Sequence, residues 1–398
     1  MIPRRDPQKV NRPLKRPEIP PAVLALSGTH LVNDVFSNIY APLLPLFIPR
    51  LGLSLAGAGS IAMAIQLAGS VAQLVFGPLA DRWRPRVLAV AGPIVAVVAL
   101  SFAGLATSPL MLAAILVVGS LGSAAFHPTA AAIVNRVGGA RRGTAMSVHV
   151  TGGAVGNALA PMIFAPYVQR FGLAWTPVLA VPALVLLAGI LRRVPDIPLA
   201  RGGRNGFSAL EPYASPLALL WTVVVIRSLV AIGFSTFLPV LMTRNGMSVS
   251  EAGFAVTCYL MAGSVGGLAG GPFADRFGPR KVIAWSLILS VPPLAAATSL
   301  SGPLSFVLLT TGGFFLGSTL PVNITYAHMI APVAAGTVSS LMMGVAWGVA
   351  GMAVPLVGLA GDAVGLGPTL QVVALLPALG AAITLALPAG RSHVEEGV

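Results

Sequence analysis

GPLADRWRPR at residues 77–86 returns as GPFADRFGPR at residues 271–280, a shift of 194 positions along the chain. The same shift aligns further residues: Pro45 with Pro239, Arg50 with Arg244, Gly52 with Gly246, Ser54 with Ser248, and Pro161 with Pro355. Matches this far apart at one fixed offset indicate a duplicated unit. The 398-residue chain is therefore expected to consist of two related halves.

Both copies of this pattern interrupt a strongly apolar sequence. Hydrophobic residues make up 56% of the chain and charged residues only 9%, whereas about a quarter of the residues in soluble proteins are charged. The apolar runs are long enough for helices that cross a bilayer, at about 20 residues each, and too uniform for barrel strands. We therefore predict an all-α integral membrane protein without a sizeable soluble catalytic domain. Its 12 transmembrane helices are expected at approximately 22–48, 55–80, 86–107, 109–134, 143–168, 173–193, 216–242, 251–274, 280–300, 303–330, 336–360 and 367–388.

Basic residues indicate how these helices are oriented. The chain has 24 Lys and Arg residues and a formal net charge of +13. With the amino terminus inside, 20 of the 24 fall in cytoplasmic segments, only Arg50, Arg170 and Arg244 fall outside, and Arg227 lies within a span. Because basic residues concentrate on the cytoplasmic side, we predict a bacterial inner-membrane protein with both termini in the cytoplasm. Topology and attraction to the lipid bilayer then explain the charge, and nucleic acid is not an expected partner.

The repeat and the longest polar connection divide the chain. We expect a basic cytoplasmic tail at 1–21, a six-helix bundle at 22–193, a cytoplasmic linker at 194–215, a second six-helix bundle at 216–390 and a cytoplasmic tail at 391–398. Parallel repeats of this kind occur in secondary transporters, whose halves rock around a site near the bilayer midplane. The single cysteine, Cys258, excludes an intramolecular disulfide, and we expect a monomer.

The duplicated pattern resembles the loop motif that follows the second helix of each half in the major facilitator superfamily. The resemblance covers about residues 22–390, although Arg84-Pro85 in the first copy replaces Gly278-Pro279 of the second. Further motifs are similar to the fosmidomycin-resistance type of efflux transporter, which implies proton-coupled export of drug-like or small anionic molecules. These motifs are His30-Leu-Val-Asn33-Asp34, Pro42-Leu-Leu-Pro45, Phe126-His127-Pro128, Arg141-Arg142-Gly143, and Arg227 shortly before Phe237-Leu238-Pro239.

Asp34 is the only carboxylate deep within a predicted span. An ionisable group in a membrane is expensive to bury and is a functional candidate by default. His30 lies one helical turn earlier on the same face. We predict that Asp34 and His30 carry the coupling proton. The alternative is a fixed ion pair that holds helices together.

Arg227 is the other charge that topology does not explain. The 194-residue shift places it on Asn33, beside the repeat partner of Asp34. We hypothesise that Arg227 binds an anionic group of the substrate, or pairs with Asp34 until that acid is protonated, because a guanidinium matches carboxylate and phosphonate geometry. A purely structural Arg–Asp pair is the alternative.

Other polar residues in the spans are candidates for a substrate cavity. His127 stands out because Pro128 after it loosens the helical turn. Each of the others is as easily explained by a hydrogen bond between helices. The candidate set is Asn33, Gln66, Gln73, His127, His149, Asn157, Arg227, Asn323 and Tyr326.

Two further sets of residues are candidates for conformational roles. Gly152, Gly153 and Gly156 precede Pro161 and resemble the bending motif in the fifth helix of drug exporters, with close packing between the halves as the alternative. The duplicated loops are expected to latch the outward-facing state at the cytoplasmic side. The latch residues are Gly77, Asp81, Arg82, Arg86, Gly271, Asp275, Arg276 and Arg280.

Several other functional classes are disfavoured. The sequence has no paired carboxylates, His-x-x-x-His metal spacing, nucleophile elbow or phosphate-binding loop, so we expect neither an enzyme, a cofactor nor a bound metal. A channel or membrane sensor does not account for the duplicated loop. The remaining rival is a symporter that imports a small metabolite on the same scaffold. The sequence leaves the substrate open.

Overall fold

The computed structural model describes residues 19–82, 85–197, 207–300, 302–332 and 335–388. Every regular element in this part of the chain is helical. Twelve helical segments are long and apolar enough to cross a membrane. The predicted all-α fold class and its 12 spans are therefore confirmed.

The first half holds six spans. Its first span is broken at Asn38 and Ile39. In a regular helix the ring of Pro42 would clash with the carbonyl oxygen of residue 38, four positions earlier. Its helices are α1 (Pro21–Ser37), α2 (Tyr40–Leu51), α3 (Leu55–Arg82), α4 (Pro85–Ser101), α5 (Pro109–Gly138), α6 (Arg142–Phe171) and α7 (Ala180–Leu191), with short 3-10 turns at Phe102–Leu105, Gly139–Arg141 and Leu173–Leu179.

The second half follows the same plan. The fifth span of this half, which is the eleventh of the chain, contains a π-helical turn at Ser340–Val345. It restarts as a new helix just before Pro355. Its helices are α8 (Ala214–Arg244, after a 3-10 turn at Phe207–Tyr213), α9 (Val249–Phe277), α10 (Pro279–Ala297), α11 (Pro303–Ile330), α12 (Ala335–Ser339), α13 (Ala346–Met352), α14 (Val354–Val364) and α15 (Leu366–Thr384).

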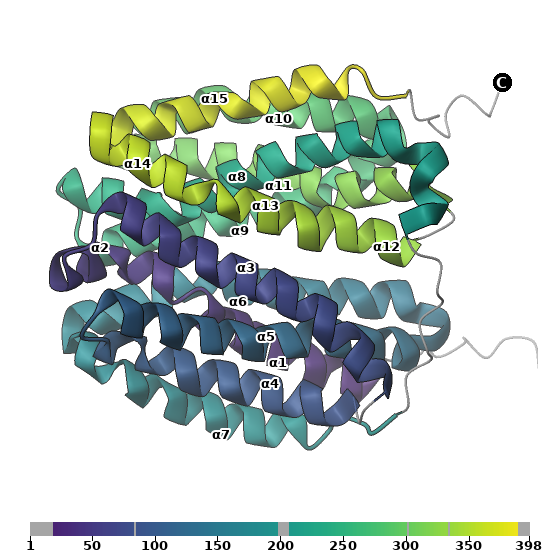
Figure 1. Ribbon diagram of the computed structural model, residues 1–398, viewed down its shortest axis with the longest axis horizontal. Helices are drawn as coiled ribbons and strands as arrows, with labels where there is room; N and C mark the ends of the chain where they lie inside the picture. Colours follow the sequence, from purple (N-terminus) through teal and green to yellow (C-terminus); the bar gives the residue numbers. More distant parts are fainter. Residues whose placement is uncertain (1–18, 83–84, 198–206, 301, 333–334, 389–398) are drawn as a thin grey trace, which may run out of the picture.

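The two halves lie side by side, with α1–α7 below and α8–α15 above in Figure 1. Large aromatic residues such as Phe126, Phe164, Phe234 and Phe237 are buried where helices meet. Many other apolar side chains lie on the surface, and Leu110 is 80% exposed. An apolar surface of this extent suits lipid rather than water.

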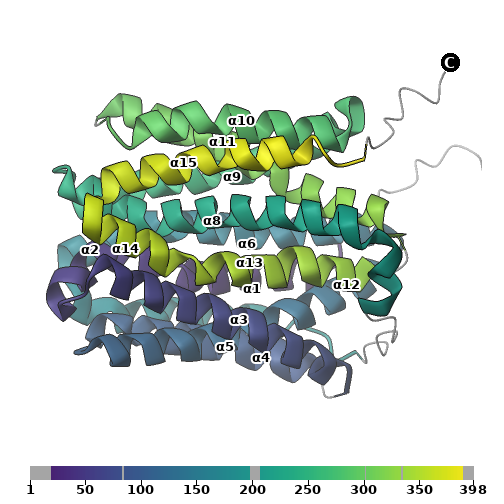
Figure 2. The same cartoon turned by 45° about the horizontal axis from the view of Figure 1, so that its top comes forward.

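We call the end of the bundle with the turns at Gly52, Gly172, Gly246 and Gly365 the outer end, after the orientation predicted from the basic residues. The opposite end is the inner end. In Figures 1 and 2, α3 and the span α12–α14 meet at the outer end and diverge towards the inner end. The two halves are therefore joined mainly at the outer end.

Glycines bring the backbones of the two halves together there. A Cβ added to Gly358 of α14 would lie 2.3 Å from the carbonyl oxygen of Leu55 in α3. A Cβ added to Gly253 of α9 would lie 2.7 Å from the carbonyl oxygen of Pro161 in α6. No real side chain tolerates either distance, so these contacts depend on glycine.

Each half also caps a helix of the other at the outer end. The carboxylate of Asp362 accepts hydrogen bonds from the backbone N–H groups of Leu55 and Ala56, both at 2.9 Å, at the start of α3. The side-chain oxygen of Gln169 accepts one from the N–H of Ser250, at 2.8 Å, at the start of α9. Because the first N–H groups of a helix have no partner within it, these bonds close the outer end across the two halves.

We expect Asp362→Ala to open the outer end. The change removes two hydrogen bonds and a negative charge at the start of α3, where charge is favourable by about 0.3–1 kcal/mol. Gln169→Ala is the matched comparison with a smaller effect, because α9 also has its own capping box of Ser248 and Glu251. The measurement is labelling by a membrane-impermeant maleimide of Val354→Cys, buried at the α3–α14 contact, in a Cys258→Ser background. Equal labelling with and without Asp362 would contradict the role.

The predicted latch at the inner end is described only in part. The burial of Gly77, the side chains of Asp81 and Arg82, and residues 83–84 lie outside the described part of the structure, while Arg86 is exposed. In the second copy, Asp275 forms no ion pair within the described residues. Arg276 lies 5.2 Å over the ring of Phe277, and Arg280 donates to the carbonyl of Leu385 in its own half. The described part of the latch does not join the halves in this structure.

Candidate functional site

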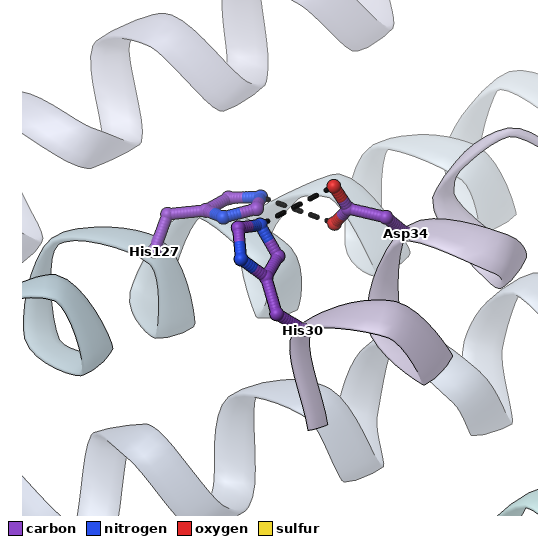
Figure 3. A group of neighbouring side chains, drawn as sticks. All are labelled: His30, Asp34 and His127. Carbon is purple, nitrogen blue, oxygen red and sulfur yellow. Dashed lines mark ion pairs between the residues drawn. The ribbon is translucent and has the colours of Figure 1, made fainter. Parts of the chain in front are cut away.

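The carboxylate of Asp34 in α1 faces two neighbouring histidines (Figure 3). The Nε2 atom of His30, one turn earlier, is 3.3 Å from Oδ2 of Asp34. The Nε2 atom of His127, in α5, is 3.6 Å from Oδ1. We call these three residues the Asp34 cluster. The side chains of Asp34 and His127 are 18% and 29% exposed, so the cluster is mostly buried and open on the His127 side.

The surroundings of His30 fix where its hydrogen sits. Its Nδ1 atom is 2.9 Å from the backbone carbonyl oxygen of His149. A carbonyl oxygen can only accept, so Nδ1 carries the hydrogen. In a neutral ring, Nε2 then presents a lone pair to a carboxylate oxygen. The His30–Asp34 contact therefore requires a proton or another cation between its two acceptor atoms.

Asn33 and Ser123 support the cluster from behind. The Nδ2 atom of Asn33 donates to Oδ1 of Asp34 at 2.9 Å and to the hydroxyl of Ser123 at 2.8 Å. The same hydroxyl is 3.0 Å from Nε2 of His127. Asn33 is fully buried. It thus joins α1 to α5 and orients the carboxylate, and it is not exposed to a cavity in this structure.

The glycines of α6 make room for His30. A Cβ on Gly153 would lie 2.3 Å from Nε2 of His30, and one on Gly156 would lie 2.2 Å from the carbonyl oxygen of Leu31. A Cβ on Gly152 would lie 2.5 Å from the carbonyl oxygen of Ser27. All three glycines thus pack against α1 within the first half, whereas close packing between the halves was one expectation. The helix itself runs unbroken through Pro161.

Arg227 is buried in the second half, at 6% exposure. Its Nε donates to the carbonyl oxygen of Leu316 in α11 at 3.4 Å, and its guanidinium lies 5.7 Å over the ring of Trp347 in α13. Tyr259 of α9 is close enough to interact electrostatically with it. Its Nη1 atom is buried without a partner. Among the described residues, the guanidinium therefore has an unused donor and no acid to neutralise it.

The expected pair between Arg227 and Asp34 is not formed. Among the described residues Arg227 takes part in no ion pair, and both ion-pair partners of Asp34 are histidines of its own half. The repeat does place Arg227 and Asn33 equivalently, because Asn33 bonds to Ser123 in α5 and Arg227 bonds to Leu316 in α11. Equivalent positions in two bundles are not neighbouring positions in this structure, so the pair stays a prediction for another state of the transporter.

The remaining candidates are scattered. His149 is 2% exposed and packs on His30, with ring centroids 4.4 Å apart. Gln66 contacts Gly351 across the halves, and Gln73 is half-buried. The side chain of Asn157 is exposed, whereas both amide atoms of Asn323 are buried without a partner. Tyr326 donates to the carbonyl of Pro388. Of these, only His149 packs against the Asp34 cluster.

Sequence reasoning missed several residues of the site. Ser123 precedes His127 by four residues, so the helical period signals that both lie on one face of α5. Trp347 and Tyr259 surround Arg227, and nothing in their spacing indicates it. The spacing of His30 and Asp34 also places two metal-binding groups on one helical face, a signal that a search for His-x-x-x-His overlooks.

Comparison with known proteins identifies the family. A sequence model described as Major Facilitator Superfamily matches residues 26–244 and 220–396. The chain belongs to the Major Facilitator Superfamily. This confirms the resemblance inferred from the duplicated loops and makes the protein a transporter of that superfamily.

Individual members of the superfamily match over most of the chain. It is 32% identical to the uncharacterized MFS-type transporter YfnC of Bacillus subtilis (strain 168), over 90% of this chain and 91% of that protein. It is 29% identical to the fosmidomycin resistance protein of Escherichia coli (strain K12), over 92% of each. The fold matches a bacterial homologue of the human lysosomal transporter Spinster, in an inward-facing and occupied conformation, with a TM-score of 0.77, 17% identity, and coverage of 94% of this chain and 97% of that one.

Proposed function

We propose that this protein exports small anionic compounds, such as fosmidomycin, in exchange for protons across the bacterial inner membrane. One observation carries the proposal: each half holds a buried charged group that lacks a counterpart. The group of the first half lacks a proton, and the group of the second half lacks an anion. In the first half, two acceptor atoms of His30 and Asp34 face each other at 3.3 Å and need a proton between them. In the second half, the buried guanidinium of Arg227 has no acid partner within the described residues.

The separation of these charges supports exchange rather than a fixed ion pair. Asp34 already contacts two histidines of its own half, so its carboxylate can stay buried without Arg227. Arg227 has a free donor, and a carboxylate or phosphonate group would satisfy both its charge and its geometry. A permanent structural pair would instead bring the two residues into contact.

The closed outer end favours a particular step of alternating access. In this state the contacts at Gly358 and Asp362 hold the halves together at the outer end, as an inward-facing conformation requires. An anion enters from the cytoplasm and binds Arg227, while the Asp34 cluster releases its proton to the same side. After the halves rock, the anion leaves outward and Asp34 takes up a new proton.

Export rests on the relative named for fosmidomycin resistance. The second candidate is a symporter that imports a small anionic metabolite, because the same proton site and the same arginine serve either direction. Membership of a transporter superfamily points to transport rather than catalysis. The direction of substrate movement against that of the proton distinguishes the two candidates.

We expect fosmidomycin to dissipate the proton gradient across everted membrane vesicles that contain the wild-type protein. In these vesicles the cytoplasmic face points outward and respiration acidifies the lumen, so an exporter exchanges luminal protons for added drug. A pH-sensitive dye reports the loss of the gradient. Asp34→Asn is expected to abolish the signal. Asp196→Asn is the matched control, because Asp196 lies outside the helices, beyond the end of α7.

Two results would refute the proposal. Wild-type vesicles that hold their gradient with every anionic drug tested would exclude proton-coupled export and favour the importer. A normal signal from Asp34→Asn would show that export does not depend on the carboxylate of the Asp34 cluster.

A further inference from the structure

We propose that the Asp34 cluster is a binding site for a divalent transition-metal ion of the zinc class. The ligand atoms are Nε2 of His30, one carboxylate oxygen of Asp34 and Nε2 of His127. These atoms all lie within 4.8 Å of one another. Among the described residues, these three form the group of His, Cys, Asp or Glu side chains that lie close enough together to hold one metal ion.

The spacing of the ligand atoms fits tetrahedral coordination. Bonds of about 2.0–2.1 Å to a tetrahedral zinc ion place neighbouring ligand atoms about 3.3 Å apart. Nε2 of His30 lies 3.3 Å from Oδ2 of Asp34, and Nε2 of His127 lies 3.6 Å from Oδ1. The two contacts use different oxygens of the carboxylate, and the three ligand atoms lie within 4.8 Å of one another. Rotation of these side chains would therefore bring one carboxylate oxygen and both nitrogens to tetrahedral spacing.

The surroundings of the ligands match those of metal sites. A metal-binding histidine usually donates its second ring N–H to a backbone carbonyl or a carboxylate, which fixes the tautomer. His30 does so through Nδ1 to the carbonyl of His149. The ligating carboxylate is in turn held by Asn33 at 2.9 Å. The unprotonated Nε2 of His30 is thus already directed at the carboxylate oxygen.

A metal ion also resolves the charge problem at this contact. Two acceptor atoms at 3.3 Å require a cation between them, and a divalent ion satisfies that requirement as a proton does. Two imidazoles and one carboxylate favour zinc, cobalt, nickel or copper over magnesium or calcium, which prefer oxygen ligands. The ion would leave one net positive charge beside a free fourth position on the exposed His127 side. Water or an anionic oxygen can take that position.

One existing hydrogen bond opposes metal binding. The hydroxyl of Ser123 lies 3.0 Å from Nε2 of His127 and competes for the same lone pair. The hydroxyl of Ser37 lies 3.2 Å from that of Ser123 and can give its own hydrogen to the carbonyl oxygen of Asn33 at 2.9 Å. Its oxygen can then accept the hydrogen of Ser123, so the Ser123 hydroxyl can turn away from His127. Removing the hydroxyl should therefore leave binding of the metal as tight or make it tighter, a result that damage to the fold would not produce.

The test is titration of the purified, untagged full-length protein with Co²⁺, whose visible absorption is much stronger in tetrahedral than in octahedral coordination. We expect one Co²⁺ per chain with a tetrahedral spectrum. His127→Gln should bind at least tenfold more weakly, and Ser123→Ala as tightly or more tightly. His328→Gln is the matched control, because His328 lies in α11 and contacts Ser339.

Three outcomes would overturn the proposal: no stoichiometric binding, equal binding by His127→Gln, or weaker binding by Ser123→Ala. A loss of binding in His328→Gln would place the metal elsewhere and has the same consequence. The titration needs no transport, so its failure leaves proton-coupled export standing. Conversely, failure of the vesicle assay leaves the metal site standing.

Discussion

Gly153→Ala is expected to abolish proton-coupled transport while leaving the protein folded. The new Cβ would lie 2.3 Å from Nε2 and 2.5 Å from Cε1 of His30, well inside van der Waals contact. The imidazole must then swing out of its place beside Asp34. Because alanine favours a helix over glycine by about 1 kcal/mol, α6 itself gains from the change. The variant thus separates the geometry of the Asp34 cluster from the stability of the bundle.

Gly143→Ala is the matched control for this variant. Gly143 lies in the same helix, and a Cβ there meets no atom within 4 Å. Both variants replace a glycine of α6 by alanine, but only Gly153→Ala displaces His30. We expect at least a tenfold loss of drug-induced proton release in vesicles for Gly153→Ala and none for Gly143→Ala, with equal elution of both from a sizing column. Normal transport by Gly153→Ala would show that His30 needs no fixed position.

The sequence predicts those parts of the molecule that depend on one helix at a time. Apolar runs of sufficient length specify the 12 spans because the bilayer accepts few other structures. The pairing of His30 with Asp34 follows from their spacing, since residues four apart share a helical face. These features are local, so no knowledge of packing is required.

The rest of the site depends on how the helices pack. His127 and His149 join Asp34 only because α5 and α6 lie against α1, and no periodicity in the sequence specifies that choice. Asp362 is read from the sequence as a charge at a helix end, yet its two hydrogen bonds cross to α3 in the other half. Arg227 was placed near Asp34 by symmetry. The repeat predicts equivalent surroundings, but not contact between two halves that diverge from the outer end.

Arg227→Met is expected to abolish export and to leave the protein as stable as the wild type or more so. The guanidinium is buried with a partnerless Nη1 and no acid beside it within the described residues. A charged residue in a membrane span costs about 2.5–3.5 kcal/mol on insertion scales. Even a buried ion pair can often be replaced by apolar side chains of similar volume without loss of stability, and a buried charge without a partner is costlier than a pair. A residue that lowers stability and is nevertheless needed for transport is explained by a ligand that it binds.

The measurement pairs thermal unfolding in detergent with drug-induced proton release in vesicles. Arg227→Lys retains the positive charge but not the planar pair of donors, so we expect intermediate transport from it. Arg244→Met, in the same helix but exposed, is the control and should transport normally. If Arg227→Met unfolded at a lower temperature than the wild type and also lost transport, Arg227 would be a structural residue. Loss of transport alone, with stability kept, is the combination expected of an arginine that acts in transport, because the membrane otherwise favours removing its charge.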